Sequence, residues 1–289
     1  MKITLAAIPY YWPRSEVVDF YARLCRANID VVYLGESVCS KRSEMTLDDW
    51  LAIAAELQRA GKEVVLTSLA LITGRNELQM MKRICAQGLQ VEANDTATVQ
   101  RLHELGQPFI CGSSINIYNA PTLQYFVRLG MRRWVAPVEL AGTDLAALLA
   151  QTTRANPIET EILGWGKLPL AYSARCYTAR AHDRPKDACK KICIDYPRGM
   201  AVTSQENTAL FMLNGIQTLS ASPQDLRALL PQVRSAGVTH FRVVPELDLQ
   251  LSFFDALKAN ISGDAQPVTI ASDACNGYWY GVAGMEIQK

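Results

Sequence analysis

The sequence predicts an α/β fold, most simply a (β/α)8 TIM-like barrel or a distorted form of it. Eight short, β-rich apolar runs recur along the chain, and an amphipathic, helix-like segment follows each of them. Most of these runs are continuously apolar, as expected for parallel strands that are covered on both faces. Eight such units are the number that closes this kind of barrel.

The eight runs define the strands that we expect, and their order along the chain is clear. A doubly wound open sheet remains the alternative architecture, because the spatial order of strands cannot be read from periodicity. The expected strands are Lys2–Ile8, Val31–Gly35, Glu63–Ser68, Leu89–Glu92, Phe109–Ser113, Arg133–Pro137, Ile158–Leu163 and His240–Pro245.

The helices between these strands carry recognisable start and stop residues. Thr46 is placed to cap the helix Leu47–Ala60, with Asp49 three residues further on and Gly61 immediately after the helix. By the same rules, further helices are expected to begin at Asn94-Asp95, at Asn119-Ala-Pro121 and at Pro223, and to end at Gly106, Gly130 and Gly237.

Length and composition allow one large domain or two small ones. The run of eight units makes a single barrel-like domain over residues 1–289 the expectation, with residues 164–239 as a cluster-binding excursion. The 29 basic and 28 acidic residues nearly cancel, which argues against a nucleic-acid-binding protein. The longest apolar stretch, Val64–Ile72, is too short to span a bilayer. The first residues lack a signal-peptide pattern, so a cytoplasmic protein is expected.

One segment departs from the regular pattern of the barrel. Residues 164–239 separate the seventh expected strand from the eighth, where the connection in a barrel is usually short. Long excursions of this kind are usually functional. Three of the eight cysteines of the chain lie within this excursion.

These three cysteines, Cys176, Cys189 and Cys193, fall within eighteen residues and indicate a metal centre. Cys189 and Cys193 are four residues apart, so they share one face if the segment is helical. A closed site needs a fourth ligand. Cys39 is the best candidate because it follows the second strand, at the same barrel end from which the excursion opens.

The residues alone leave three interpretations of these cysteines open. Four thiolates without a histidine favour an iron–sulfur cluster over a catalytic zinc. A structural zinc is a serious alternative, although the paired Cys-x-x-Cys knuckles typical of such sites are absent. The third is a group of free thiols. The remaining cysteines are expected to be structural: Cys25, Cys85, Cys111 and Cys275.

Polar residues also follow several strand ends, and in a barrel they would ring one mouth and form a candidate substrate pocket. The simpler explanation is that strand ends meet water and carry polar residues anyway. The candidates are Glu36, Glu92, Asn116, Asn119 and Glu139.

Two stretches around the cysteines resemble the signature of the collagenase-like peptidase family. They are Tyr172-Ser-Ala-Arg-Cys176 and Asp183-Arg-Pro-Lys-Asp-Ala-Cys189. The resemblance implies a barrel-like domain joined to a cysteine-bound iron–sulfur cluster. The chain is similar, more narrowly, to the branch of this family that acts in oxygen-independent ubiquinone biosynthesis. The stretches that carry this second resemblance are Tyr33–Arg42, Leu168–Arg180, Leu213–Thr218 and Cys275–Trp279.

The narrower resemblance implies a [4Fe–4S] cluster held by Cys39, Cys176, Cys189 and Cys193. Many relatives carry His-Gly before the signature and another cysteine after it, whereas this chain has Trp165-Gly-Lys-Leu-Pro169 and lacks both. Cys39 would then be the fourth ligand, and peptidase activity is not expected.

The same resemblance implies partners and a reaction. It implies a heterodimer with UbiU that hydroxylates prenylated aromatic precursors of ubiquinone without O2, with prephenate as a hydroxyl donor. A lipid-binding SCP2-type protein, UbiT, would present the substrate. The chain also lacks His-Glu-x-x-His, Gly-x-Ser-x-Gly and phosphate-binding glycine motifs.

Overall fold

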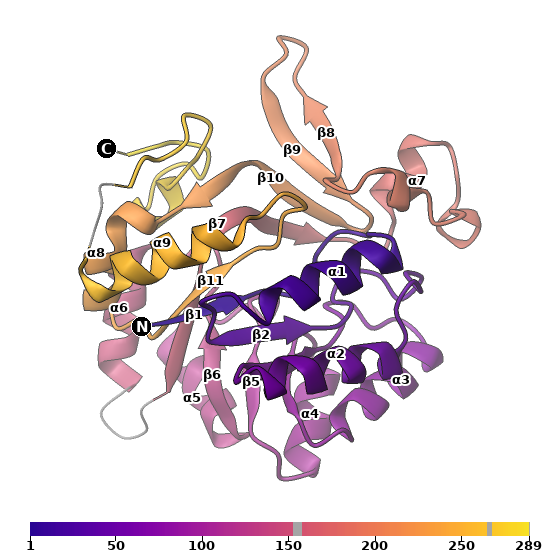
Figure 1. Cartoon of the computed structure of the whole chain (residues 1–289), viewed down its shortest axis with the longest axis horizontal. Helices are drawn as coiled ribbons and strands as arrows, with labels where there is room; N and C mark the ends of the chain where they lie inside the picture. The colour runs from indigo at the N-terminus through magenta and orange to yellow at the C-terminus, as the bar shows by residue number, and fades with distance from the viewer. Residues whose placement is uncertain (153–157, 265–267, 289) are drawn as a thin grey trace.

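The computed structural model describes residues 1–152, 158–264 and 268–288, and its centre is a closed parallel barrel (Figure 1). The final strand of the barrel pairs with both the first and the seventh, which closes the ring. The predicted (β/α)8 barrel is therefore confirmed, and the open sheet is excluded. The barrel strands are β1 (Lys2–Leu5), β2 (Val31–Leu34), β3 (Glu63–Thr67), β4 (Gln90–Ala93), β5 (Phe109–Cys111), β6 (Met131–Val135), β7 (Glu159–Tyr172) and β11 (His240–Val243).

Helices surround this barrel, and several begin at the predicted caps. Thr46 and Asp49 form a capping box, in which the Thr46 hydroxyl accepts from the Asp49 N–H at 3.2 Å and the Asp49 carboxylate accepts from the Thr46 N–H at 2.9 Å. Asp95 and Asn119 cap two later helices, as expected. The helices are α1 (Arg14–Leu24), α2 (Leu47–Arg59), α3 (Arg75–Cys85), α4 (Thr96–Glu104), α5 (Ala120–Arg128), α6 (Gly142–Thr152) and α9 (Leu251–Ser262).

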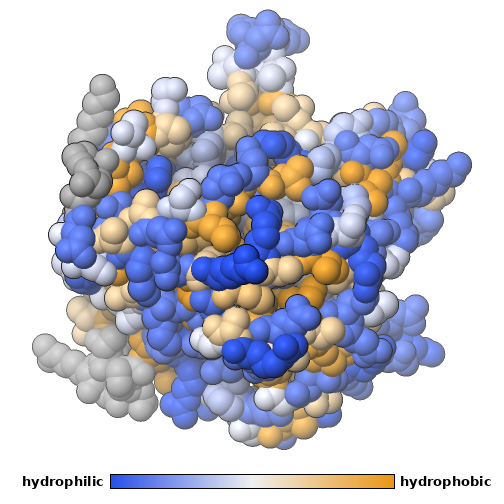
Figure 2. All heavy atoms as spheres, viewed as in Figure 1, coloured by the Kyte–Doolittle hydropathy of each residue, from blue (hydrophilic) through white to orange (hydrophobic). Residues whose placement is uncertain are grey.

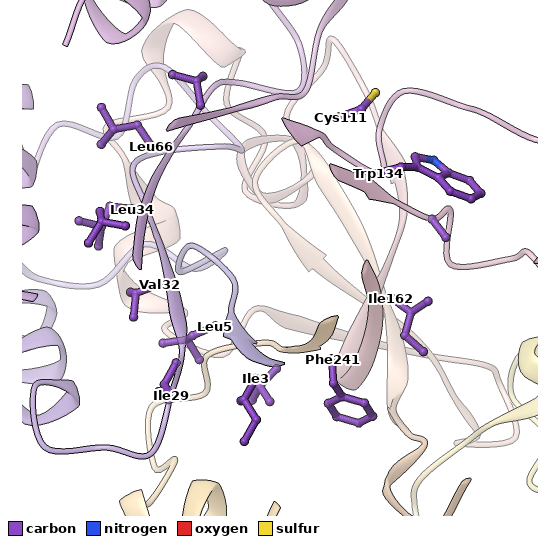
Figure 3. Close-up of a cluster of buried hydrophobic side chains, with 14 of the residues drawn as sticks. Ile3, Leu5, Ile29, Val32, Leu34, Leu66, Cys111, Trp134, Ile162 and Phe241 are labelled. Atoms are coloured by element: carbon purple, nitrogen blue, oxygen red, sulfur yellow. The ribbon is translucent and has the colours of Figure 1, made fainter. Parts of the chain in front are cut away.

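The main hydrophobic core lies between the barrel and its helices. Alternate strand residues such as Leu34, Leu66, Trp134 and Phe241 are buried and point outward from the ring of strands (Figure 3). The face shown in Figure 2 is predominantly hydrophilic, with hydrophobic residues in scattered groups. Within the described ranges, no helix has the length and apolar character needed to cross a membrane.

The interior of the barrel contains a buried ionic network where many barrels have apolar layers. The Glu161 carboxylate is fully buried and accepts from Arg242 Nε at 2.6 Å and from the Tyr33 hydroxyl at 2.6 Å. Arg242 Nη1 also donates to Glu92 at 2.7 Å, and its guanidinium lies 4.2 Å from the centre of the Tyr33 ring. Strands from opposite sides of the barrel are thereby joined by charged hydrogen bonds.

The excursion after the seventh barrel strand extends the sheet rather than forming a simple loop. β7 continues to Tyr172 and pairs with β10 in antiparallel fashion, and the β8–β9 hairpin projects away from the barrel (Figure 1). The excursion consists of α7 (Tyr177–Ala181), η1 (Lys186–Ala188), η2 (Ile192–Asp195), β8 (Met200–Thr203), β9 (Ala209–Asn214), β10 (Gln217–Asp225), η3 (Arg227–Leu229) and α8 (Leu230–Ser235).

Two expectations within this region are wrong. The seventh strand does not end at Leu163, because β10 supplies a pairing partner for the residues beyond it. Pro223 does not begin a helix. It lies in β10 beside a register shift, where the missing N–H of proline is tolerated. The helix that ends before Gly237 begins at Leu230, with a proline in its first turn.

Candidate metal centre

The structure brings the four predicted cysteines together around one small cavity. Cys39 comes from the loop after β2, and Cys176 is the residue immediately before α7. Cys189 and Cys193 follow on the irregular segment after α7. All four are partly exposed free thiols. Cys39 and Cys176 are 137 positions apart in the sequence, yet both line this cavity. The cavity lies at the barrel end where the sequence predicts that the loop and the excursion meet.

The turn between β9 and β10 fixes the position of Cys176. The Tyr177 N–H donates to the Gly215 carbonyl at 2.8 Å, and the Gly215 N–H donates to the Thr178 hydroxyl at 2.9 Å. Gly215 has a φ of +67°, which favours glycine in this two-residue hairpin turn. A Cβ atom at this position would also lie 3.2 Å from Arg42 Nη2.

Cys189 and Cys193 do not lie on one helix, so the condition for a shared helix face is not met. The two short 3₁₀ segments η1 and η2 are separated by Cys189, Lys190 and Lys191, and the two lysines have φ angles of 50° and 55°. Two consecutive left-handed residues interrupt any helix at this point. The chain nevertheless turns so that both thiols line the same cavity.

Lysine side chains join the Cys39 loop to the excursion. Lys41 Nζ donates to the Lys186 carbonyl at 2.9 Å and to the Asp187 carboxylate at 2.7 Å. In the opposite direction, Lys191 Nζ donates to the Ser43 hydroxyl. These contacts join the two cysteine-bearing segments.

Arg42 is the buried cation of the site. Its guanidinium donates to the Pro9 carbonyl at 2.6 Å and to Asn214 Oδ1 at 2.7 Å, and it lies 3.6 Å from the Glu36 carboxylate. Asn214 in turn donates to the Pro9 carbonyl at 2.7 Å, so the β9–β10 turn and the first strand's loop are both tied to Arg42. The side chain of Arg42 is only 2% exposed and forms part of the cavity wall.

The charged side chains that line the cavity are basic, although Lys41 and Arg42 also contact Asp187 and Glu36. The described lining of the cavity includes four basic side chains, Lys41, Arg42, Lys186 and Lys191, and no acidic side chain. Burial raises the pKa of the Cys39 and Cys193 thiols, whereas Arg42 acts in the opposite direction on both pKa values. Cations around a cysteine cluster stabilise thiolates, which are the form that binds metal.

The donor type of the cavity, four cysteine sulfurs and no histidine, is the one that iron–sulfur clusters use. Among the described residues, no three His, Cys, Asp or Glu side chains are grouped so that they could hold a metal ion. The four thiols instead surround a cavity. A [4Fe–4S] cluster is bound by four cysteine thiolates, each on a different iron, and therefore requires sulfurs spread around a body larger than one ion.

The other predicted pocket residues do not gather around this cavity. Glu36 accepts from the N–H groups of Val38 and Cys39 at 2.7 and 3.0 Å, so it shapes the cysteine loop. Glu92 lies inside the barrel, in the network with Arg242. Asn119 caps α5.

The remaining two candidates of that pocket lie on the surface. Asn116 and Glu139 are exposed, and Glu139 accepts a hydrogen bond of 3.5 Å from the Tyr118 hydroxyl. Of the five candidates, only Glu36 adjoins the cysteine site, through its contacts with Arg42 and Cys39.

Sequence reasoning also missed residues that belong to the site. Lys41 and Arg42 directly follow Cys39-Ser40, so a basic pair beside an expected ligand was the available signal. Asn214 offered no signal of its own, because its role depends on a turn that forms far from Arg42 in the sequence. The four cysteines expected to be structural lie outside the cavity: Cys25, Cys85, Cys111 and Cys275.

Fold and site together define a parallel (β/α)8 barrel with a cysteine cavity built by an excursion after its seventh strand. Residues 18–247 match the profile of Peptidase family U32, and the chain belongs to this family. It is similar to a protein named collagenase from Porphyromonas gingivalis, with 23% identity over 240 residues. That match covers 75% of this chain and 56% of the relative, so the chain spans about half the length of that protein.

Solved structures with a similar arrangement are distant in sequence. Dihydropteroate synthase from Xanthomonas albilineans is 10% identical with a TM-score of 0.40, and the match covers 92% of this chain and 95% of that one. The spore cortex-lytic enzyme SleL from Bacillus cereus is also 10% identical, with a TM-score of 0.41 and coverage of 90% and 75%. Similarity at this level says nothing about the chemistry of this chain.

Proposed function

We propose that the chain is the iron–sulfur subunit of an oxygen-independent hydroxylase acting on prenylated aromatic precursors of ubiquinone, the role of UbiV. The observation that carries this proposal is the convergence of Cys39, Cys176, Cys189 and Cys193, from separate segments, on one cation-lined cavity. Membership of Peptidase family U32 and the sequence stretches similar to the ubiquinone branch support the same assignment.

The residues of the chain have distinct parts in this proposal. The four cysteines would hold a [4Fe–4S] cluster, while Arg42 and Lys41 would offset the charge of the thiolates. Such a cluster, when bound, supplies one-electron transfer. With four cysteine ligands no iron remains open, which favours an electron-transfer part over direct binding of substrate.

The proposal includes partners for the remaining steps. UbiU would complete a heterodimer, prephenate would supply the hydroxyl group, and the SCP2-type protein UbiT would deliver the prenylated substrate. We do not propose peptidase activity, because the sequence lacks the hydrolytic motifs His-Glu-x-x-His and Gly-x-Ser-x-Gly.

A second candidate is a non-catalytic scaffold in which zinc or a cluster staples the excursion to the barrel and the partner performs the chemistry. The contacts from Lys41 to Asp187 and from Lys191 to Ser43 support this candidate only in that they join the same two segments that such a metal would hold together. Metal content distinguishes the two, because stoichiometric zinc without sulfide would select the scaffold.

Removal of the gene from its host tests the proposed function. Cells without it should lose ubiquinone during growth without oxygen and keep normal ubiquinone in air, since only the oxygen-independent hydroxylation would be missing. Mass spectrometry of quinone extracts measures both, and the wild-type gene should restore the anaerobic level. Normal anaerobic ubiquinone in the deletion strain, or peptide cleavage by the purified chain alone, would contradict the proposal.

A further inference from the structure

A large cavity lies beside the cysteine site and belongs to neither the barrel interior nor the metal centre. Its volume is about 580 Å³, within the usual range of small-molecule sites. Leu34 of β2 and Leu66 of β3 form part of its wall, and both point outward from the barrel (Figure 3). The cavity therefore occupies the layer between barrel and helices, between α2 and α3.

The two helices beside the cavity pack on their outer neighbours rather than on each other. α1 packs on α2 and α3 packs on α4, whereas α2 and α3 make few contacts with each other. The space between them is lined by large apolar side chains, among them Trp50, Met45, Met80 and Ile84. Well-packed proteins leave few such voids. Methionine side chains adapt to irregular ligands, so this lining suits a flexible apolar chain.

Polar groups of the cavity gather where the Cys39 loop meets the start of α3. The Ser40 hydroxyl donates to the Glu77 carboxylate at 2.5 Å, and the same carboxylate accepts from the Gly74 N–H at 2.9 Å. Lys41 and Arg42 also line this cavity, and both line the cysteine cavity as well. One stretch of loop is therefore the wall between the two cavities.

We infer that the cavity between α2 and α3 binds a lipid-like molecule, with its apolar chain among Trp50, Met80 and Ile84 and its polar head at the Ser40–Arg42 wall. Lys41 and Arg42 would then contact both the head group and the cysteine cavity, since both side chains line the two cavities. This inference rests on the proposed function. It adds that the apolar substrate binds to this chain rather than to its partner.

Two matched variants on α3 test the site. Met80 and Leu78 are 40% and 38% exposed, but only Met80 lines the cavity. The probe is cis-parinaric acid, a fluorescent fatty acid, titrated into the full chain, and wild type should bind it saturably. Met80→Glu should weaken binding about tenfold or more, since a carboxylate in the cavity must be desolvated, and Leu78→Glu should change it less than about twofold.

A second pair of variants guards against misfolding of α3. Ile72 lines the cavity and its neighbour Leu71 does not. Ile72→Trp should reduce binding by filling the space, whereas Leu71→Trp should not. No saturable binding to wild type, or equal binding in Met80→Glu and Leu78→Glu, would overturn the inference.

Two further measurements, competition for the probe site and iron content, show whether the lipid site or the proposed function fails. Displacement of the probe by geranylgeraniol supports an isoprenoid ligand, as a prenylated substrate requires. Displacement by palmitate alone keeps the lipid site and contradicts the prenylated assignment. Iron content of Met80→Glu should equal that of wild type, so a chain that binds the probe but no iron would refute the cluster and leave the cavity assignment intact.

Discussion

Replacing both Cys39 and Cys193 with alanine should yield a folded protein that binds almost no iron and no longer supports anaerobic ubiquinone synthesis. The two residues come from the barrel loop and from the excursion, so the change removes ligands from both sides of the cavity. Two remaining thiolates cannot hold a [4Fe–4S] cluster. Visible absorbance after anaerobic reconstitution, and quinone analysis of complemented cells, measure the two effects.

Cys25→Ala/Cys85→Ala is the matched control for this variant. It removes the same number of thiols, one directly after α1 and one at the end of α3, both outside the cavity. Cluster absorbance should stay at the wild-type level in this control, with at most a small loss of stability from the buried Cys85. Equal iron in the Cys39/Cys193 variant and in wild type would refute the ligand assignment.

Glu161→Ala should lower the free energy of unfolding by about 3–5 kcal/mol, because it leaves Arg242 buried with an incomplete set of partners. Glu159→Ala is the comparison on the same strand. The Glu159 side chain is 45% exposed, and the buried Arg133 that it contacts keeps its bonds to Glu63 and Tyr33, so the loss of Glu159 should cost clearly less than the loss of Glu161. Urea unfolding at pH 7 measures both, and a cost below about 1 kcal/mol for Glu161→Ala would contradict the role of the network.

The same carboxylate predicts how stability depends on pH. Burial alone would raise the pKa of Glu161, but Arg242 and Arg133 outweigh burial and lower the pKa to about 2. The pKa of Glu161 is therefore lower in the folded state than in the unfolded state, where it is about 4.3. The stability that this difference provides is fully present above about pH 4.3 and is lost as the pH falls toward about 2. Glu161→Gln should therefore show a flatter loss of stability over this acidic range.

The barrel could be predicted because its signals are local. Parallel strands covered on both faces read as apolar runs, and residues such as Thr46 and Asn119 mark helix starts by capping chemistry within one turn. The extension of β7 could not be predicted in this way. Gly164 and Pro169 interrupt the apolar pattern there, and the strand forms only because β10, about fifty residues later, pairs with it.

The residues of the site also differ in whether nearby sequence or only the folded chain reveals them. Cysteines are scarce enough that three within one excursion stand out, and strand topology placed Cys39 near them. The wall formed by Lys41 and Arg42, and the cavity between α2 and α3, arise from segments that meet only in the folded chain. Glu161 and Arg242 did offer a signal, as charges within otherwise apolar strands, and their pairing required the closed barrel.

The central claim is that the four cysteines hold an iron–sulfur cluster, and metal analysis of the wild-type chain tests it most directly. Protein purified without oxygen should contain about four irons and four acid-labile sulfides per chain, with a broad visible absorbance that bleaches in air. Stoichiometric zinc without sulfide, or no metal after anaerobic reconstitution, would contradict the claim.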